Sequence, residues 1–218
     1  RNGEVYPQQL TITAVKGDAG ELTHYVATLH DITLRKQLEK EVAQLAFFDP
    51  LTQLANRRLF NDRLGQVLTR ARRTQSAMAL LFIDLDKFKP INDAHGHEVG
   101  DWVLQSVARR ILACLRASDT AARVGGDEFL VLLPDIQTSN DAIALAEKLR
   151  QALEQPYVTP AGLSMRASAS IGIAICPKHG QSAQDLLRLG DQAMYQAKNA
   201  GGNSVQMIHP EHEPALPD

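Results

Sequence analysis

The stretch at residues 123–133 constrains the fold most, because two glycines and two acids interrupt an otherwise β-prone, apolar segment. Gly125 and Gly126 supply the backbone freedom of a tight turn, and the apolar run after them is typical of a strand. The pattern predicts a β-hairpin that holds Asp127 and Glu128 at a rigid tip, with room for a large ligand. An ordinary glycine-rich turn with solvated acids explains these residues equally well.

A second group of acids follows an apolar strand predicted over residues 77–84. This strand delivers Asp84 to its carboxyl end, where open α/β sheets bind ligands, and alternation places Asp86 on the same face. Beside the hairpin, Asp84 and Asp127 could share Mg²⁺, which takes few carboxylates and completes its shell with substrate phosphates. Lys89 would then bring positive charge to a phosphoryl group in transfer. The alternative is a strand that ends in a solvated, acid-rich loop, which is the commoner use of an Asp-x-Asp pattern.

Composition narrows the class of protein. The 218 residues are 44% hydrophobic, which is enough for the core of one domain with or without an appendage. A formal net charge of −2 argues against a nucleic-acid partner. Cys114 and Cys176 show no metal-ligand spacing, so a reducing cytoplasm is expected. No signal peptide or membrane span is visible, and we expect a cytoplasmic domain, with membrane attachment upstream of Arg1 left open.

The first part of the chain has its own pattern. Residues 9–15 and 23–29 alternate as strands do around a turn at 16–20, and two strands alone are only marginally stable. Residues 1–33 are therefore expected to be the end of a larger sheet. Residues 34–48 place Leu34, Leu38, Leu45 and Phe48 near a coiled-coil seam, which favours a short dimerising linker helix. A surface helix packed on its own domain remains the alternative.

Helix and strand signals alternate beyond residue 49 and predict one α/β (α+β) domain over residues 49–208. Helices are expected near 56–74, 98–116, 139–154 and 182–200, strands at 77–84 and 164–176, and a hairpin at 120–133. The sheet is expected at the centre, flanked by helices. Residues 209–218, rich in proline and charge, are expected to form a disordered tail.

Five segments in order along the chain resemble successive motifs of the GGDEF family of diguanylate cyclases, over about residues 46–208. They are residues 49–58, 84–101, 125–129, 170–174 and 191–198. The resemblance implies a palm-like domain with a central, mainly antiparallel sheet. It also implies condensation of two GTP molecules into cyclic di-GMP and pyrophosphate across a homodimer. The start of the chain, with Asn2-Gly3-Glu4, the hairpin and residues 30–36, resembles the C-terminal end of a PAS sensor domain.

The resemblance also implies roles for individual residues. Asp84, the backbone carbonyl of Leu85 and Asp127 would bind Mg²⁺, or Mn²⁺ in its place, with Glu128 in support. Asp127 also holds the position of the family's proposed general base. The substrate-binding set would be Asn92 and Asp101 on guanine, His97 against the nucleotide, Gly125 and Gly126 at the phosphates, and Lys198 on the triphosphate. His97 could instead be a helix-entry histidine beside Gly96.

Two further sequence features bear on regulation and on the strength of GTP binding. Arg116 and Asp119 keep the spacing to the hairpin of the family's R-x-x-D inhibitory site, and Lys148 or Arg150 could add a basic partner. A helix-end Arg followed by a helix-terminating Asp would give the same pattern. Gly202 stands where the family often carries a basic residue, which predicts weaker GTP binding. The favoured function is a cyclase controlled by an upstream sensor. The alternative is a catalytically weak GTP- or cyclic-di-GMP-binding regulatory domain.

Overall fold

A computed structural model describes residues 5–208, apart from the side chains of residues 40, 41 and 43. The expected tail at 209–218 and Asn2-Gly3-Glu4 therefore lie outside the described residues. The chain divides into two compact units, Arg1–Ala46 and Phe47–Asp218, which are considered separately below. No helix in the described part of the chain is both long enough and apolar enough to cross a membrane.

The first unit contains the predicted hairpin, formed by β1 (Gln8–Lys16) and β2 (Leu22–Asp31). It also contains all but the last residue of α1 (Thr33–Phe47), the predicted helix. One face of the hairpin carries Leu10, Ile12, Tyr25 and Leu29, and each of these side chains is more than half exposed. This apolar face therefore has no cover from the described residues. Phe48 corrects one expectation, because it lies beyond α1 and pairs with Ala55 in an isolated β-bridge.

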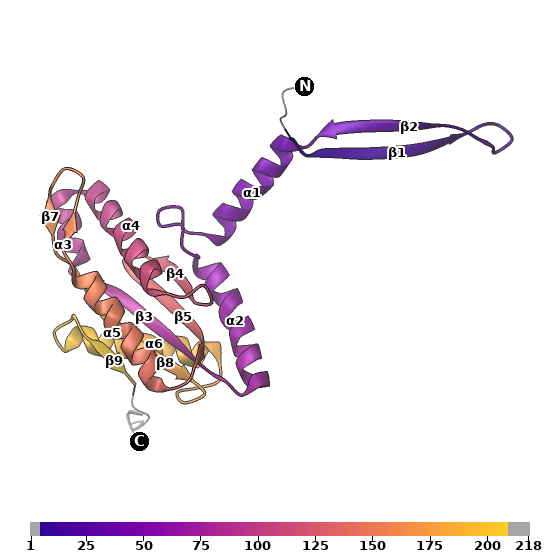
Figure 1. Cartoon of the computed structure of the whole chain (residues 1–218). Helices are drawn as coiled ribbons and strands as arrows, with labels where there is room; N and C mark the ends of the chain where they lie inside the picture. The colour runs from indigo at the N-terminus through magenta and orange to yellow at the C-terminus, as the bar shows by residue number, and fades with distance from the viewer. Residues whose placement is uncertain (1–4, 209–218) are drawn as a thin grey trace, which may run out of the picture. The chain divides into compact units, whose positions relative to one another are not determined.

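The second unit is built around a five-stranded sheet in the order β4-β5-β3-β8-β9 (Figure 1). Neighbouring strands are antiparallel except for the parallel pair β8 and β9, which confirms a mainly antiparallel central sheet flanked by helices. The strands are β3 (Ala77–Asp86), β4 (Thr120–Gly125), β5 (Glu128–Ile136), β6 (Tyr157–Val158), β7 (Ser164–Met165), β8 (Ser168–Cys176) and β9 (Val205–Met207). The helices are α2 (Arg57–Thr74), α3 (Phe88–His95), α4 (His97–Cys114), α5 (Ser139–Glu154) and α6 (Ala183–Asn199).

Several elements differ from the expectation. Residues 164–176 do not form one strand, because β7 pairs with β6 in a separate ladder and only β8 joins the central sheet. The short helix α3, the two-residue strand β6 and the strand β9 were not predicted. Only Phe88 and Ile91 of α3 are buried, so its eight residues carry little periodic signal, and Gly96 at φ 83° separates it from α4.

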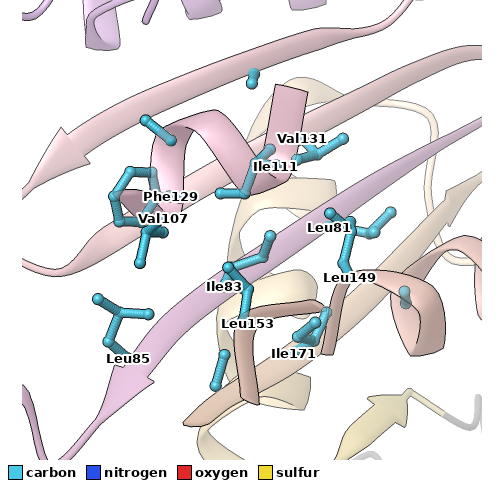
Figure 2. Packing of buried hydrophobic residues seen from close by; sticks show 14 of the residues in the cluster. Leu81, Ile83, Leu85, Val107, Ile111, Phe129, Val131, Leu149, Leu153 and Ile171 are labelled. Carbon is cyan, nitrogen blue, oxygen red and sulfur yellow. The ribbon is translucent and has the colours of Figure 1, made fainter. Parts of the chain in front are cut away.

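Alternate residues of β3 face two different helix layers. Leu81, Ile83 and Leu85 pack with residues of α4 and α5 such as Ile111 and Leu149 (Figure 2). Met78 and Leu80 pack with α2 and with Leu186 of α6. Because side chains alternate along a strand, Asp84 and Asp86 belong to the α2 and α6 face.

The close approach of α6 to β8 sets where the C-terminal end of that helix lies. A Cβ added to Gly172 of β8 would collide with the carbonyl oxygen of Gly190 and the backbone nitrogen of Met194. Ser182 is the N-cap of α6, and its hydroxyl accepts a hydrogen bond from the Asp185 N–H. Lys198, in the last turn of α6, thereby arrives over the end of β3.

Candidate active site

The strand register brings the predicted acids to one end of the sheet. Asp84 pairs with Glu128 on β5 and with Ser170 on β8. The Leu85 N–H donates to the carbonyl oxygen of Asp127 at 3.3 Å, which ties the hairpin tip to the end of β3. The tip is therefore held beside the strand that carries Asp84.

Lys198 completes this cluster. Its Nζ lies 2.7 Å from Oδ1 of Asp84, whose side chain is only 8% exposed. Burial raises the pKa of the Asp84 carboxyl, and the negative charges of Asp127 and Glu128 raise it further. The hydrogen bond and charge of Lys198 lower that pKa, but the net shift is upward. Burial lowers the pKa of Lys198, but the hydrogen bond and charge of Asp84, with Asp127 and Asp86, outweigh it and raise that pKa overall. The ammonium group therefore stays charged at neutral pH.

The donor set fits a hard divalent cation only in part. Among the described residues, no group of three or more His, Cys, Asp and Glu side chains is close enough to hold a metal ion. However, the buried Asp84 carboxylate has one cationic neighbour and two anionic ones, so the site carries unbalanced negative charge. Mg²⁺ commonly binds through one or two carboxylates together with substrate phosphates. Asp84 and Asp127, with the Leu85 carbonyl, could supply the protein share of such a shell.

Asp86 has a different role from Asp84, which the sequence did not reveal. It accepts hydrogen bonds from the hydroxyls of Ser168 and Ser170, at 2.6 and 2.7 Å, and from the Asn203 N–H at 2.8 Å. Asp86 therefore fixes the loop that follows α6. Gly202 in that loop has a φ of 75°, and a Cβ there would lie 3.0 Å from the Asp86 carboxyl group.

Asp49 and Arg123 brace the hairpin tip from another side. Asp49 accepts from the N–H and hydroxyl of Thr52, at 2.8 and 2.6 Å, and from Arg123 Nη1 at 3.2 Å. Arg123 Nε and Nη2 both donate to the Gly126 carbonyl, at 2.9 and 2.8 Å. Burial raises the pKa of Asp49, but these hydrogen bonds and the Arg123 charge outweigh it and lower that pKa. The sequence signal that could have pointed to Arg123 is a cation two residues before the glycine pair, with Val124 between them.

The residues predicted for guanine lie on α3 and α4. Oδ1 of Asn92 is buried and accepts no hydrogen bond from the described residues. It lies against Gly100, where any Cβ would collide with it, so Asn92 sits beside the residue that precedes Asp101. Asp101 is exposed, and so is His97, the first residue of α4. The structure thus places Asn92 near Asp101, and the His97 side chain makes no hydrogen bond or ion pair with another described residue.

Lys89 is exposed on α3 and makes no hydrogen bond or ion pair with another described residue. Gly125 and Gly126 are exposed at the hairpin tip, and Gly126 has a φ of 43°. A Cβ at Gly126 would have no heavy atom within 4 Å. The tip is therefore open to a ligand on the side of this position.

The residues of the predicted inhibitory site share one pocket of about 760 Å³. Arg116, Asp119 and Lys148 line it together with Asp135 and Asp141. The Arg116 N–H donates to the Asp119 carboxylate at 2.9 Å, so the two residues of the motif form one turn.

Arg150, a neighbour of Lys148 on α5, does not line this pocket. It donates instead to Glu147, Glu154 and Asn203. Of the two basic residues on this part of α5, Lys148 is the one that lines the pocket of Arg116 and Asp119.

These features define a class: an α/β domain with helices on both faces of a mainly antiparallel sheet and a lysine-paired acidic site at one end of it. The family model described as the diguanylate cyclase GGDEF domain matches residues 46–204. The chain therefore belongs to the GGDEF family.

Relatives with curated descriptions are longer than this chain. The bifunctional diguanylate cyclase/cyclic di-GMP phosphodiesterase MucR of Pseudomonas aeruginosa is 50% identical over 164 residues, which are 75% of this chain and 24% of MucR. The diguanylate cyclase TpbB of the same organism is 42% identical over 166 residues, 76% of this chain and 38% of TpbB. The chain thus spans about a quarter of one relative and less than two fifths of the other.

A solved structure shares the fold. The coiled coil and GGDEF domain of DgcB from Caulobacter crescentus, crystallised in complex with c-di-GMP, aligns with a TM-score of 0.73 at 29% identity. The alignment covers 80% of this chain and 92% of that one.

Proposed function

We propose that this chain is a diguanylate cyclase that condenses two GTP molecules into cyclic di-GMP. In this reaction the 3′ hydroxyl of each GTP bonds to the α-phosphorus of the other, and two pyrophosphate groups leave. The observation that carries the proposal is the ion pair between the buried Asp84 carboxylate and Lys198, beside the Asp127–Glu128 tip, in a domain of this family.

Each site residue has a proposed role. Asp84, Asp127 and the Leu85 carbonyl hold Mg²⁺ or Mn²⁺, with Glu128 in support, and the bound cation supplies charge neutralisation at the phosphates. Asp127 stands as general base for the attacking hydroxyl. The remaining roles are Asn92 and Asp101 on guanine, His97 against the nucleotide, Gly125 and Gly126 at close approach, and Lys89 and Lys198 on the phosphates.

Lys198 links substrate binding to the state of Asp84. In the structure its ammonium group balances the buried carboxylate. A phosphate oxygen is an equally good acceptor for a charged amine, so Lys198 can pass from Asp84 to the nucleotide. We infer that this exchange leaves Asp84 available as an anionic ligand when GTP is present.

The condensation needs two nucleotides, and one acidic site accounts for one of them. A homodimer with two facing sites therefore supports the reaction, and geometry between the copies would set its rate. In α1, Leu34, Leu38 and Leu45 form an exposed apolar series that suits a linker between copies. The apolar hairpin before it suits the end of an upstream sensor domain of the PAS type.

The pocket of Arg116, Asp119 and Lys148 supports product inhibition, since guanidinium and carboxylate groups suit the phosphate and guanine groups of cyclic di-GMP. We expect cyclic di-GMP to inhibit turnover of the wild-type chain. Arg116→Ala should raise the inhibitory concentration at least tenfold, because a charge-assisted hydrogen bond of ~1.5–3 kcal/mol is lost. Unchanged sensitivity to product in that variant would remove the inhibitory site.

The alternative function is a catalytically weak domain that binds GTP or cyclic di-GMP for regulation, and Gly202 is the observation that favours it. The test is product analysis after incubation of the purified chain with GTP and Mg²⁺. We expect cyclic di-GMP and pyrophosphate, at least a hundredfold less of both from Asp127→Ala, and little change for Asp62→Ala, which removes an exposed carboxylate on α2. GTP binding without any product, in a demonstrated dimer, would establish the alternative.

A further inference from the structure

A separate pocket of about 450 Å³ lies at the hairpin tip beside Asp49. Three arginines, Arg57, Arg58 and Arg123, line it together with Gly125 and Gly126. Of these residues, only the two glycines belong to the nucleotide site described above. The pocket therefore shares the hairpin tip with the acidic site but has its own, oppositely charged walls.

Arg57 and Arg58 stand where helix formation disfavours them. They are the first two residues of α2, whose first turn contains no acid, and cations at a helix N-terminus oppose the helix dipole. Arg57 Nη2 donates to the Val124 carbonyl at 3.0 Å, and the Arg58 guanidinium lies 5.1 Å from the centre of the Phe47 ring. These contacts orient the two side chains without neutralising them, so both guanidinium groups remain available to an anion.

The balance of charge favours an anion. Among the residues that line the pocket, one carboxylate, Asp49, faces three guanidinium groups. Arg123 is the group that Asp49 neutralises, and its side chain is only 14% exposed. Arg57 and Arg58 are exposed, and a guanidinium group presents five N–H donors in a geometry that matches phosphate oxygens.

The backbone around the pocket contributes room for a ligand rather than hydrogen-bond donors. The side chain of Asn56 already accepts from the N–H groups of Arg58 and Leu59, at 3.0 and 3.1 Å, so recognition depends on the guanidinium groups. At Gly126 an added Cβ would have no neighbour within 4 Å. A ligand as large as a phosphate group can approach the tip there.

We propose that this pocket is a second phosphate-binding site, which receives a phosphate group of the GTP held by a second copy of the chain. The choice of GTP as the ligand rests on the proposed function. The domain's own nucleotide is accounted for by Asp84, Lys198 and their neighbours. The shared glycines place the arginine pocket directly beside the tip on which the second nucleotide must react.

The first experiment tests anion binding without catalysis. Inorganic pyrophosphate is titrated into the whole chain in EDTA, so that the acidic site, without a cation, repels it, and backbone amide shifts are followed by NMR. We expect saturable shifts at Gly126 and in the first turn of α2. The affinity should fall at least tenfold in Arg57→Ala/Arg58→Ala and stay within twofold in Arg73→Ala, which removes an exposed arginine at the other end of α2.

Equal affinity for pyrophosphate in the double variant, or no saturable shift in the wild type, would overturn the site whether or not the chain turns over GTP. Arg58→Ala alone is the companion variant, because Arg58 contacts a ring and holds no strand in place. It should weaken binding at least threefold with an unchanged melting temperature.

A second experiment identifies the source of the phosphate group. If GTP of the opposite copy supplies it, Arg58→Ala lowers pyrophosphate release at least tenfold, while GTP affinity per domain, measured with Ca²⁺, changes less than twofold. If turnover is retained and only inhibition by added pyrophosphate is lost, the site takes free pyrophosphate, and the assignment to the opposite copy is wrong. A GTP affinity that falls with turnover would assign the pocket to the domain's own nucleotide and also contradict the proposal.

Discussion

At the scale of single residues, Gly202 and Asp86 are coupled. Gly202 has a φ of 75°, a left-handed conformation that L side chains rarely adopt, and its Cα lies close to the Asp86 carboxylate. That carboxylate already accepts three hydrogen bonds, from the hydroxyls of Ser168 and Ser170 and from the Asn203 N–H. A basic side chain at position 202 would therefore begin beside an acid and extend from a strained backbone.

Gly202→Arg should tighten GTP binding about tenfold, since one charge-assisted hydrogen bond contributes ~1.5–3 kcal/mol, part of which the strain offsets. The free energy of unfolding should fall by roughly 1–2 kcal/mol because of the left-handed backbone. Calorimetric titration with GTP and Ca²⁺ measures the first effect and thermal unfolding the second. Gly202→Ala is the matched control: it should show the same loss of stability and no gain in affinity. Equal affinities for the two variants would mean that position 202 does not reach the nucleotide.

The residues of the candidate site could be predicted from the sequence where they lie within short motifs. Asp84 lies at the end of an apolar strand, and Asp127 follows two glycines, so the local pattern predicted their positions at a strand end and a hairpin tip. The partners of Asp86 could not be predicted, because Ser168 and Asn203 lie far from it along the chain and meet it only through sheet pairing. Arg57, in the first turn of α2, gave no local signal for its place beside the hairpin.

At the scale of elements, the packing of α6 on β8 decides where Lys198 lies. The two elements approach so closely at Gly172 that a methyl group there would meet the backbone of α6 at Gly190 and Met194. Backbone atoms cannot move aside as a flexible side chain can. The helix would have to shift as a whole, and its last turn would carry Lys198 away from Asp84.

Gly172→Ala should therefore lower the free energy of unfolding by about 2–3 kcal/mol, the cost of overpacking a well-packed core. It should also weaken GTP binding, because Lys198 is displaced. Chemical denaturation and GTP titration measure the two effects. The control is Gly65→Ala in α2, where an added methyl group meets nothing within 4 Å. Because alanine is the better helix former, that variant should gain up to about 1 kcal/mol. A fully stable Gly172→Ala protein would contradict the close contact.

Element prediction was accurate where the apolar pattern was long and failed where it was short. The hairpin of β4 and β5 and the helices α2, α4, α5 and α6 were expected close to their observed positions. The eight residues of α3 and the three of β9 are too few for a periodic signal, and β9 is ordered by parallel pairing with β8. Both of these elements flank the candidate site.

At the scale of the whole molecule, the proposed reaction requires two copies of the chain. In the proposed function, the acidic tip, Lys198 and the residues assigned to guanine hold a single nucleotide, whereas the cyclic product contains two. The exposed apolar series of α1 and the uncovered face of the N-terminal hairpin are both suited to contacts with further protein. Activity should therefore depend on association of copies more than on the affinity of one site for GTP.

The most direct test of the central proposal is the initial rate of pyrophosphate release from GTP and Mg²⁺, measured against protein concentration, with the oligomeric state determined by sedimentation in parallel. While monomers dominate, the rate should rise faster than linearly with concentration, and addition of Asp127→Ala chain should suppress it as mixed dimers form. A constant rate per chain across concentrations at which sedimentation shows only monomers would contradict a reaction centre built from two copies.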